Sequence, residues 1–242
     1  MIVERVEHPQ WLSNAYLVAE REGGNGFFID GNGLTGELEQ RTADANITIT
    51  HVLCTHGHAD HVVGVEELAA RHGVPLLAHA DTDVRADERL ADGDTIASGP
   101  LTVRAVYTPG HCDDHLAFLV DDTNCFTADV LFKGTVGGTA GPTGDLAKLK
   151  HSILDVLLAL APETRIFPGH REDTTIGAER ESNPFIRAWL DGEGLGEEPC
   201  RVGGEDATLL LWAPDYDGGN KALVRLASGE ETIVGGSRVE RR

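Results

Sequence analysis

Short runs of apolar residues, separated by glycine-rich turns, dominate the first half of the chain. Apolar runs of this length that are bounded by glycine and polar residues are typical of β-strands. The strands predicted in this way are Ala15–Ala19, Gly26–Ile29, Ile47–Cys54, Leu76–Ala78, Leu101–Val106 and Leu116–Val120.

Two other segments place their apolar residues at helical spacing. Val62–His72 has this pattern and is followed by Gly73, a residue type that commonly ends helices. Leu146–Leu160 repeats apolar residues at intervals of three and four before Pro162. Helices interspersed among strand-rich blocks predict a mixed α/β fold.

The pattern changes near Asp191, where the glycine-rich and acidic segment DGEGLGEEP begins. Beyond it, Ala207–Trp212 and Lys221–Leu226 read as strands separated by glycine turns. We therefore predict a main domain over residues 1–190 and a small β-rich C-terminal extension over residues 191–242.

The chain carries 40 acidic residues against 20 lysines and arginines, a formal charge of -20. So large a charge destabilises the compact state by self-repulsion, and concentrated salt screens most of that repulsion. We expect a protein adapted to high internal salt, as in a halophile; an ordinary acidic cytosolic enzyme is the alternative. Either way the charge repels nucleic acid phosphates, so we expect no nucleic acid partner.

Several patterns favour a cytoplasmic protein. No stretch approaches the roughly 20 apolar residues that a membrane-spanning helix needs. The N-terminal MIVERVEHPQ lacks the apolar core of a secretory signal. The four cysteines form no C-x-x-C pair and no disulfide-type spacing, which fits free thiols in a reducing compartment. The sequence leaves the oligomeric state open.

The segment THGHADH, residues 55–61, gathers three histidines and an aspartate between a predicted strand and a predicted helix. On an extended backbone, His56 and His58 project to the same side. Asp60 and His61 follow directly, so four metal-ligating side chains converge at the end of a strand. Imidazole and carboxylate groups suit zinc, with iron or manganese as alternatives. A polar loop with unrelated histidines would instead crowd imidazoles that repel each other when protonated.

THGHADH resembles the T-H-x-H-x-D-H signature of the metallo-beta-lactamase superfamily, and later segments match further motifs of that family in order. TPGHCDDH contains His111, FTADVLF contains Asp129 and FPGH contains His170. The resemblance spans roughly residues 12–190 and implies a four-layer αβ/βα sandwich, to which the predicted β appendage is added.

Carried over residue by residue, the resemblance implies two divalent metal ions, zinc in the first instance. One would be bound by His56, His58 and His111 and the other by Asp60, His61 and His170, with Asp129 bridging both. The implied nucleophile is a metal-bound hydroxide that Asp60 orients. Asp30, in FFIDGNG, matches an aspartate that the family often places near the site; a simple turn residue is the alternative. Lys133 is a candidate substrate contact, with a solvated loop lysine as its alternative.

Two segments, ADVLFKGTVGG and FPGHREDTTIGAERESNPF, are similar to the type II glyoxalase-like branch, the hydroxyacylglutathione hydrolases. This similarity implies hydrolysis of a small-molecule hydroxyacyl (lactoyl-type) thioester to a 2-hydroxy acid and a free thiol. Gly138 stands where that branch usually has a basic residue, which puts the glutathione carrier in question. The carboxylate Asp129 replaces the cysteine of common metallo-beta-lactamases and argues against lactam hydrolysis.

Persulfide dioxygenases provide a second hypothesis from another reaction class, because they share the fold, the histidine motifs and a stretch similar to TTIGAERESNP. They use a single iron held by two histidines and one aspartate, which here would be His56 or a neighbour, His111 and Asp129. Both activities predict the same residues, so the metal and its ligands decide between them.

Overall fold

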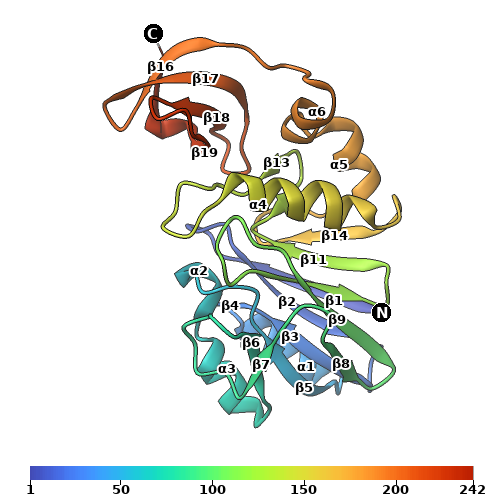
Figure 1. Ribbon diagram of the computed structural model, residues 1–242. Coiled ribbons are helices and arrows are strands. Elements are labelled where there is room, and N and C mark those ends of the chain that lie inside the picture. The colour runs from blue at the N-terminus through green and yellow to red at the C-terminus, as the bar shows by residue number, and fades with distance from the viewer. Residues whose placement is uncertain (242) are drawn as a thin grey trace. The chain divides into compact units, whose positions relative to one another are not determined.

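The computed structural model describes residues 1–241 (Figure 1). Contacts along the chain divide it into two compact units. The first unit comprises Met1–Tyr107, Asp114–Ala128 and Gly169–Arg171. The second unit comprises Thr108–Asp113, Asp129–Pro168 and Glu172–Arg242. The predicted division at residue 190 stays a prediction.

A mixed six-stranded sheet in the first unit has the strand order β1-β2-β3-β5-β6-β7. β1, β2 and β3 pair antiparallel, whereas β3, β5, β6 and β7 pair parallel. All six residues of β2 are buried, as expected for a strand covered on both faces. The bounds are β1 Ile2–Glu7, β2 Asn14–Ala19, β3 Asn25–Ile29, β5 Thr48–Leu53, β6 Leu76–His79 and β7 Glu88–Leu90.

Helices connect two of the three parallel strand pairs, because a parallel pair needs a crossover, whereas β6 and β7 are joined by a segment without a helix. α1 (Gly36–Asp44) links β3 to β5, after the two-residue strand β4 (Gly31–Asn32). α2 (Ala59–Val62) and α3 (Val65–His72) link β5 to β6. The buried faces of α1 and α3 contribute Leu38, Val65 and Leu68 to the same apolar cluster as the sheet residues.

The predicted helix over Val62–His72 is wrong at its start. Gly64 adopts a left-handed backbone, φ +80°, and separates α2 from α3. A helical periodicity does not reveal such a break, because the apolar positions continue across it. The end was predicted correctly, since Gly73 caps α3 with φ +65°.

The remaining strands of the first unit, β8 to β11, are joined antiparallel in chain order. All five residues of β10 are buried, so this strand forms the centre of its layer. The bounds are β8 Thr95–Ser98, β9 Leu101–Tyr107, β10 Leu116–Val120 and β11 Asn124–Ala128. All six strands predicted in the first half of the chain are present.

The second unit contains two strand pairs and a group of helices. The pairs are β12 with β13 and β14 with β15, both antiparallel. The bounds are β12 Leu131–Phe132, β13 Thr135–Val136, β14 Arg165–Pro168, β15 Thr174–Thr175, α4 Leu146–His151, α5 Ile176–Ser182 and α6 Pro184–Asp191. The helix predicted over Leu146–Leu160 is present from Leu146 to Ala159. It changes from α-helix to π-helix at Ser152 and to a 3-10 helix at Leu157.

The C-terminal segment forms a five-stranded antiparallel sheet with the strand order β19-β18-β17-β16-β20. Its strands are β16 Glu198–Val202, β17 Glu205–Pro214, β18 Asn220–Leu226, β19 Glu231–Gly235 and β20 Val239–Arg241, with a short 3-10 helix at Gly236–Arg238. Both strands predicted beyond residue 191 are confirmed by β17 and β18. The sheet, orange to red in Figure 1, has its own apolar cluster, which includes Cys200, Leu209 and Val224.

The four cysteines lie buried as free thiols. Burial raises the pKa of the Cys125 thiol to about 12, so this group stays neutral at physiological pH. The thiols are free, as the cysteine spacing predicted, and these residues act as small apolar side chains. Within residues 1–241, no helix is long and apolar enough to cross a bilayer.

Candidate metal centre

The THGHADH segment runs from the end of β5 into α2. Thr55 and His56 are buried, whereas His58 is exposed. The Leu116 amide of β10 donates to the Thr55 carbonyl at 2.8 Å, which fixes the loop between two strands of the same unit. The motif therefore lies mainly on a strand-to-helix loop, as predicted, although Asp60 and His61 belong to the first turn of α2 rather than preceding a helix.

The Asp30 carboxylate holds this segment from the end of the neighbouring parallel strand. Asp30 Oδ1 accepts from the Thr55 amide at 2.8 Å, and Oδ2 accepts from the Thr55 hydroxyl at 2.8 Å. His61 Nδ1 lies 2.9 Å from Asp30 Oδ2, so this nitrogen donates and Nε2 is left as the ligating atom. Asp30 also has a left-handed backbone, φ +61°. Asp30 is thus a turn residue, and its side chain also orients a histidine of the motif. Both of the alternatives given for Asp30 therefore apply.

Asp60, His61 and His170 form the more enclosed ligand group, and all three belong to the first unit. Asp60 Oδ2 lies 3.6 Å from His61 Nε2 and 3.5 Å from His170 Nε2. One ligand atom from each residue lies within 4.8 Å of the others, a spacing that a single ion would satisfy. His170 is only 3% exposed, and backbone bridging to Ser13 fixes its position.

His56 and His58 form a second pair in the first unit, with Nε2 and Nδ1 3.1 Å apart. His56 Nδ1 lies 3.0 Å from the Thr55 hydroxyl. His115 is fully buried, with its ring centroid 5.1 Å from that of His56. The pair lies on one side of the loop, as the alternation along an extended backbone predicts.

His111 and Asp129 form a pair in the second unit. His111 Nε2 lies 3.7 Å from Asp129 Oδ2. His111 Nδ1 donates to the Gly138 carbonyl at 2.9 Å, which leaves Nε2 as the nitrogen for ligation. A hydrogen bond of this kind is how metal-binding histidines are commonly oriented in proteins.

The C-terminal sheet holds the segment that supplies the Gly138 carbonyl. In β19, the Ile233 amide donates to the Thr139 hydroxyl at 2.9 Å, and the Thr139 amide donates to the Ile233 carbonyl at 3.0 Å. Lys221 of β18 donates from Nζ to the Val136 carbonyl at 2.7 Å. The residues on both sides of Gly138 are therefore bonded to this sheet, so the sheet supports His111 through one intervening residue.

Lys221 is a buried lysine that sequence reasoning did not select. Its Nζ lies 3.0 Å from Asp215 Oδ1 and 5.2 Å from the centre of the Phe132 ring. Burial lowers the pKa of Lys221, and the adjacent Asp215 carboxylate opposes that shift. The signal was a single lysine in the apolar segment KALV, in a chain with only four lysines. Lys133, which was selected as a substrate contact, is exposed in the β12–β13 turn.

The donor set agrees with a divalent metal ion. Imidazole nitrogens and carboxylate oxygens are the ligands that zinc, iron and manganese share, and within the first unit Asp60, His61 and His170 place such atoms within binding distance of one ion. The structure thus supports a metal-binding protein, while the choice of metal and the number of ions remain proposals.

Comparison with known proteins agrees with this chemistry. The model of the Metallo-beta-lactamase superfamily matches residues 8–170. The chain therefore belongs to the metallo-beta-lactamase superfamily. The predicted αβ/βα metallo-beta-lactamase fold is thereby confirmed, and the chain is a metallo-hydrolase.

Three relatives of this superfamily show how far the similarity extends. An uncharacterized protein of Mycobacterium tuberculosis is 34% identical, over 72% of this chain and 92% of the relative. Hydroxyacylglutathione hydrolase GloC of Haemophilus influenzae is 29% identical, over 78% of this chain and 99% of the relative. The crystal structure of ETHE1 from Myxococcus xanthus is 28% identical with a TM-score of 0.72, over 80% of this chain and 92% of that structure.

Removing the Asp30 carboxylate should weaken metal binding. In Asp30→Ala, His61 loses the acceptor that fixes its Nδ1 proton, and we expect metal affinity to fall about 10- to 100-fold. Competition with a chromogenic chelator measures the change. The exposed Asp81→Ala is the matched control and should bind metal like the parent protein. Equal metal affinity in both variants would contradict the role assigned to Asp30.

Removing the Thr139 hydroxyl tests the support that the C-terminal sheet gives to His111. Thr139→Val keeps the side-chain shape but deletes the acceptor of the Ile233 amide, so we expect about tenfold faster loss of metal to a chelator. Thr208→Val, in β17 of the same sheet, serves as the control. If both variants lose metal at the parent rate while their urea midpoints are alike, the sheet does not position His111.

Proposed function

We propose that this metallo-hydrolase cleaves hydroxyacyl (lactoyl-type) thioesters to a 2-hydroxy acid and a free thiol. The observation that carries the proposal is the ligand group Asp60, His61 and His170, which combines two imidazoles with one carboxylate. Similarity to GloC of H. influenzae, a hydroxyacylglutathione hydrolase by name, along nearly all of that relative's length supports this substrate class.

The proposed ligand assignment follows the family resemblance. His56, His58 and His111 would hold one divalent ion and Asp60, His61 and His170 a second, with Asp129 shared. Zinc is the proposed metal, with iron or manganese as alternatives. When bound, such ions lower the pKa of water toward about 7 and polarise a carbonyl oxygen.

The chain's own residues would provide orientation. Asp30 and Gly138 fix the Nδ1 protons of His61 and His111, so both rings present Nε2. The side chain of Asp60 is 25% exposed, which leaves it accessible to accept a hydrogen bond from the attacking water. A thiolate leaving group, with a thiol pKa of about 8.5, departs without a strong general acid. The site therefore provides the groups that thioester hydrolysis requires.

Gly138 bears on the identity of the thiol carrier, because it stands where the glyoxalase-like branch has a basic residue. A Cβ atom at Gly138 would meet only the Ile233 carbonyl oxygen, at the ordinary contact distance of 3.6 Å. The backbone there can thus accept an arginine. Its absence favours a carrier without the carboxylates of glutathione.

Release of free thiol from a panel of lactoyl thioesters tests the substrate class. Metal-loaded protein should release thiol rapidly, and chelation should abolish the release. A carrier without carboxylates should give the highest kcat/KM. Gly138→Arg should lower KM for the glutathione thioester about threefold and leave the uncharged carrier unchanged, since an exposed ion pair contributes about 0.2–1 kcal/mol. No metal-dependent release from any carrier would overturn the thioesterase proposal.

The alternative is a mono-iron persulfide dioxygenase, favoured by the segment TTIGAERESNP. In this segment the buried Glu179 accepts from the Gly134 amide, the Thr174 hydroxyl and Asn183 Nδ2 at 2.7–2.8 Å. The segment thus holds the β12–β13 turn through the Gly134 amide, and this contact does not depend on which reaction occurs. Oxygen consumption by iron-loaded protein with a persulfide, without thioester cleavage, would select this alternative.

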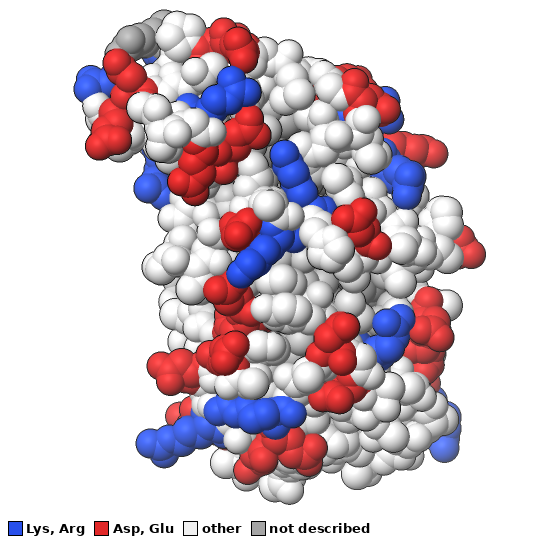
Figure 2. Space-filling view, in the orientation of Figure 1, with Lys and Arg blue, Asp and Glu red and all other residues white. Residues whose placement is uncertain are grey.

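We further infer that the protein works in a salt-rich cytoplasm and has no nucleic acid partner. The net charge of -20 supports this inference. On the face shown in Figure 2, Asp and Glu side chains are spread over the surface rather than gathered in one patch. A dispersed excess of negative charge lowers stability by repulsion across the surface, and salt relieves that repulsion.

The urea midpoint of the metal-free protein should rise from dilute buffer to about 1 M KCl, where the screening length falls to about 3 Å. The same series near pH 4.8, the isoelectric point of the sequence, should show little salt dependence, because the net charge vanishes there. A midpoint at neutral pH that is unchanged or lower in KCl would exclude charge repulsion as the reason for salt adaptation.

A further inference from the structure

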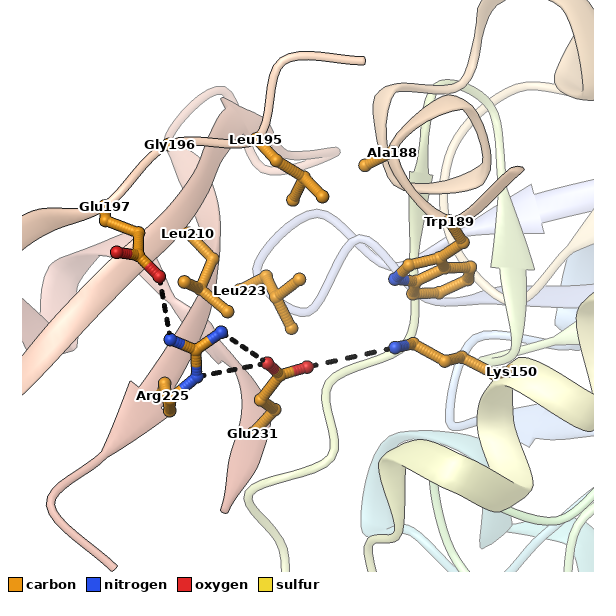
Figure 3. Close-up of a pocket in the computed structure, with 10 residues that line it drawn as sticks. All are labelled: Lys150, Ala188, Trp189, Leu195, Gly196, Glu197, Leu210, Leu223, Arg225 and Glu231. Atoms are coloured by element: carbon orange, nitrogen blue, oxygen red, sulfur yellow. Dashed lines mark hydrogen bonds and ion pairs between the residues drawn. The ribbon is translucent and has the colours of Figure 1, made fainter. Parts of the chain in front are cut away.

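A cavity of about 430 Å³ lies within the second unit (Figure 3). It is formed by α4, by α6 with the connection after it, and by three strands of the C-terminal sheet. Apart from Lys150, its lining residues lie between positions 188 and 231, beyond the part of the chain that matches the superfamily model. The volume is within the range of small-molecule sites.

One wall of the cavity is aliphatic. Leu210 and Leu223 project from β17 and β18, and both are nearly fully buried. Leu195, from the connection after α6, borders the same space and is 47% exposed. Figure 3 shows these three leucines facing the side from which Trp189 and Lys150 enter. The wall is suited to a hydrocarbon chain or ring.

The acidic groups of the cavity already have cationic partners. Glu231 Oε1 accepts from Arg225 Nε at 3.3 Å and from Nη2 at 3.1 Å, and Glu197 Oε1 accepts from Arg225 Nη1 at 3.0 Å. These bonds raise the pKa of Arg225 above its usual value. Neither the guanidinium nor these carboxylate oxygens need a ligand.

Trp189 and Lys150 line the opposite side of the cavity. Trp189 Nε1 is buried and, within residues 1–241, has no hydrogen-bond partner. Lys150 Nζ forms an ion pair with Glu231 Oε2 at 3.9 Å, which is longer than a hydrogen bond, and lies 5.6 Å from the centre of the Trp189 ring. A buried donor without an acceptor is unfavourable, and most such groups in proteins are paired. The cavity therefore lacks an acceptor close to the indole nitrogen.

We propose that this cavity binds an apolar monocarboxylate, whose carboxylate accepts from Trp189 Nε1 and Lys150 while its hydrocarbon part packs against Leu195, Leu210 and Leu223. A carboxylate supplies an acceptor oxygen for the indole N–H and a charge opposite to that of lysine. The hydrocarbon part uses the leucine wall. This site is separate from the proposed hydrolysis and does not depend on it.

The net charge of the protein affects this binding in a testable direction. A charge of -20 repels an anionic ligand at long range, and added salt screens that repulsion. Affinity for the carboxylate should therefore rise with KCl. Ligand binding through an exposed ion pair alone would instead weaken as KCl is added.

Calorimetric titration of the metal-loaded protein with octanoate in KCl tests the proposal. Octanoate should bind at one site, and octanol, which keeps the chain but lacks the charge, should bind at least about tenfold more weakly. Trp189→Phe keeps an aromatic ring and removes only the N–H, and Lys150→Met removes only the charge. Each should weaken octanoate binding about tenfold or more.

Lys148→Met, on the same helix but outside the cavity, is the matched control and should bind octanoate like the parent protein. Circular dichroism spectra identical to the parent establish that each variant is folded. Octanoate that fails to bind the parent protein, or that binds Trp189→Phe and Lys150→Met as tightly as Lys148→Met, would overturn the proposed site.

Discussion

The hydrogen bonds of the Asp30 carboxylate are the interaction on which the candidate centre depends most. β3 and β5 are adjacent parallel strands, so their carboxyl ends meet at one edge of the sheet. Asp30 ends one strand and binds Thr55 and His61 after the other. The apolar core fixes the pairing of β3 with β5, and this pairing positions Asp30. The Asp30 carboxylate in turn fixes the orientation of the His61 ring. The position of this loop also accounts for the burial of Thr55 and His56.

The C-terminal sheet serves the site rather than merely following it in the sequence. β18 and β19 bond to Val136 and Thr139, and the carbonyl of the intervening Gly138 orients His111. This arrangement explains why contacts place residues beyond 190 in the same unit as Asp129–Pro168. The same sheet contributes Leu210 and Leu223 to the wall of the cavity beside Trp189. An extension beyond the superfamily match therefore has two roles, one in positioning and one in the proposed binding of a carboxylate.

Local patterns in the sequence predicted much of the fold and the ligand types. Strands such as β2 and β10 are continuous apolar runs, because both of their faces are buried, and such runs are easy to recognise. The ligand residues were recognisable because THGHADH crowds side chains that few other roles would tolerate together. The break at Gly64 was missed, since periodicity continues across a single left-handed residue. Lys221 and Glu179 were missed because their importance lies in contacts with residues distant in the sequence.

We propose that the chain binds two metal ions, and the metal stoichiometry of the intact protein tests this proposal most directly. Native mass spectrometry of metal-loaded protein should show two ions per chain for the parent. His170→Ala should show one ion per chain and lose thioester cleavage, because His170 belongs to only one of the proposed ion sites. A parent protein that saturates at one ion, or a His170→Ala variant that keeps two ions and full thioester cleavage, would contradict the account.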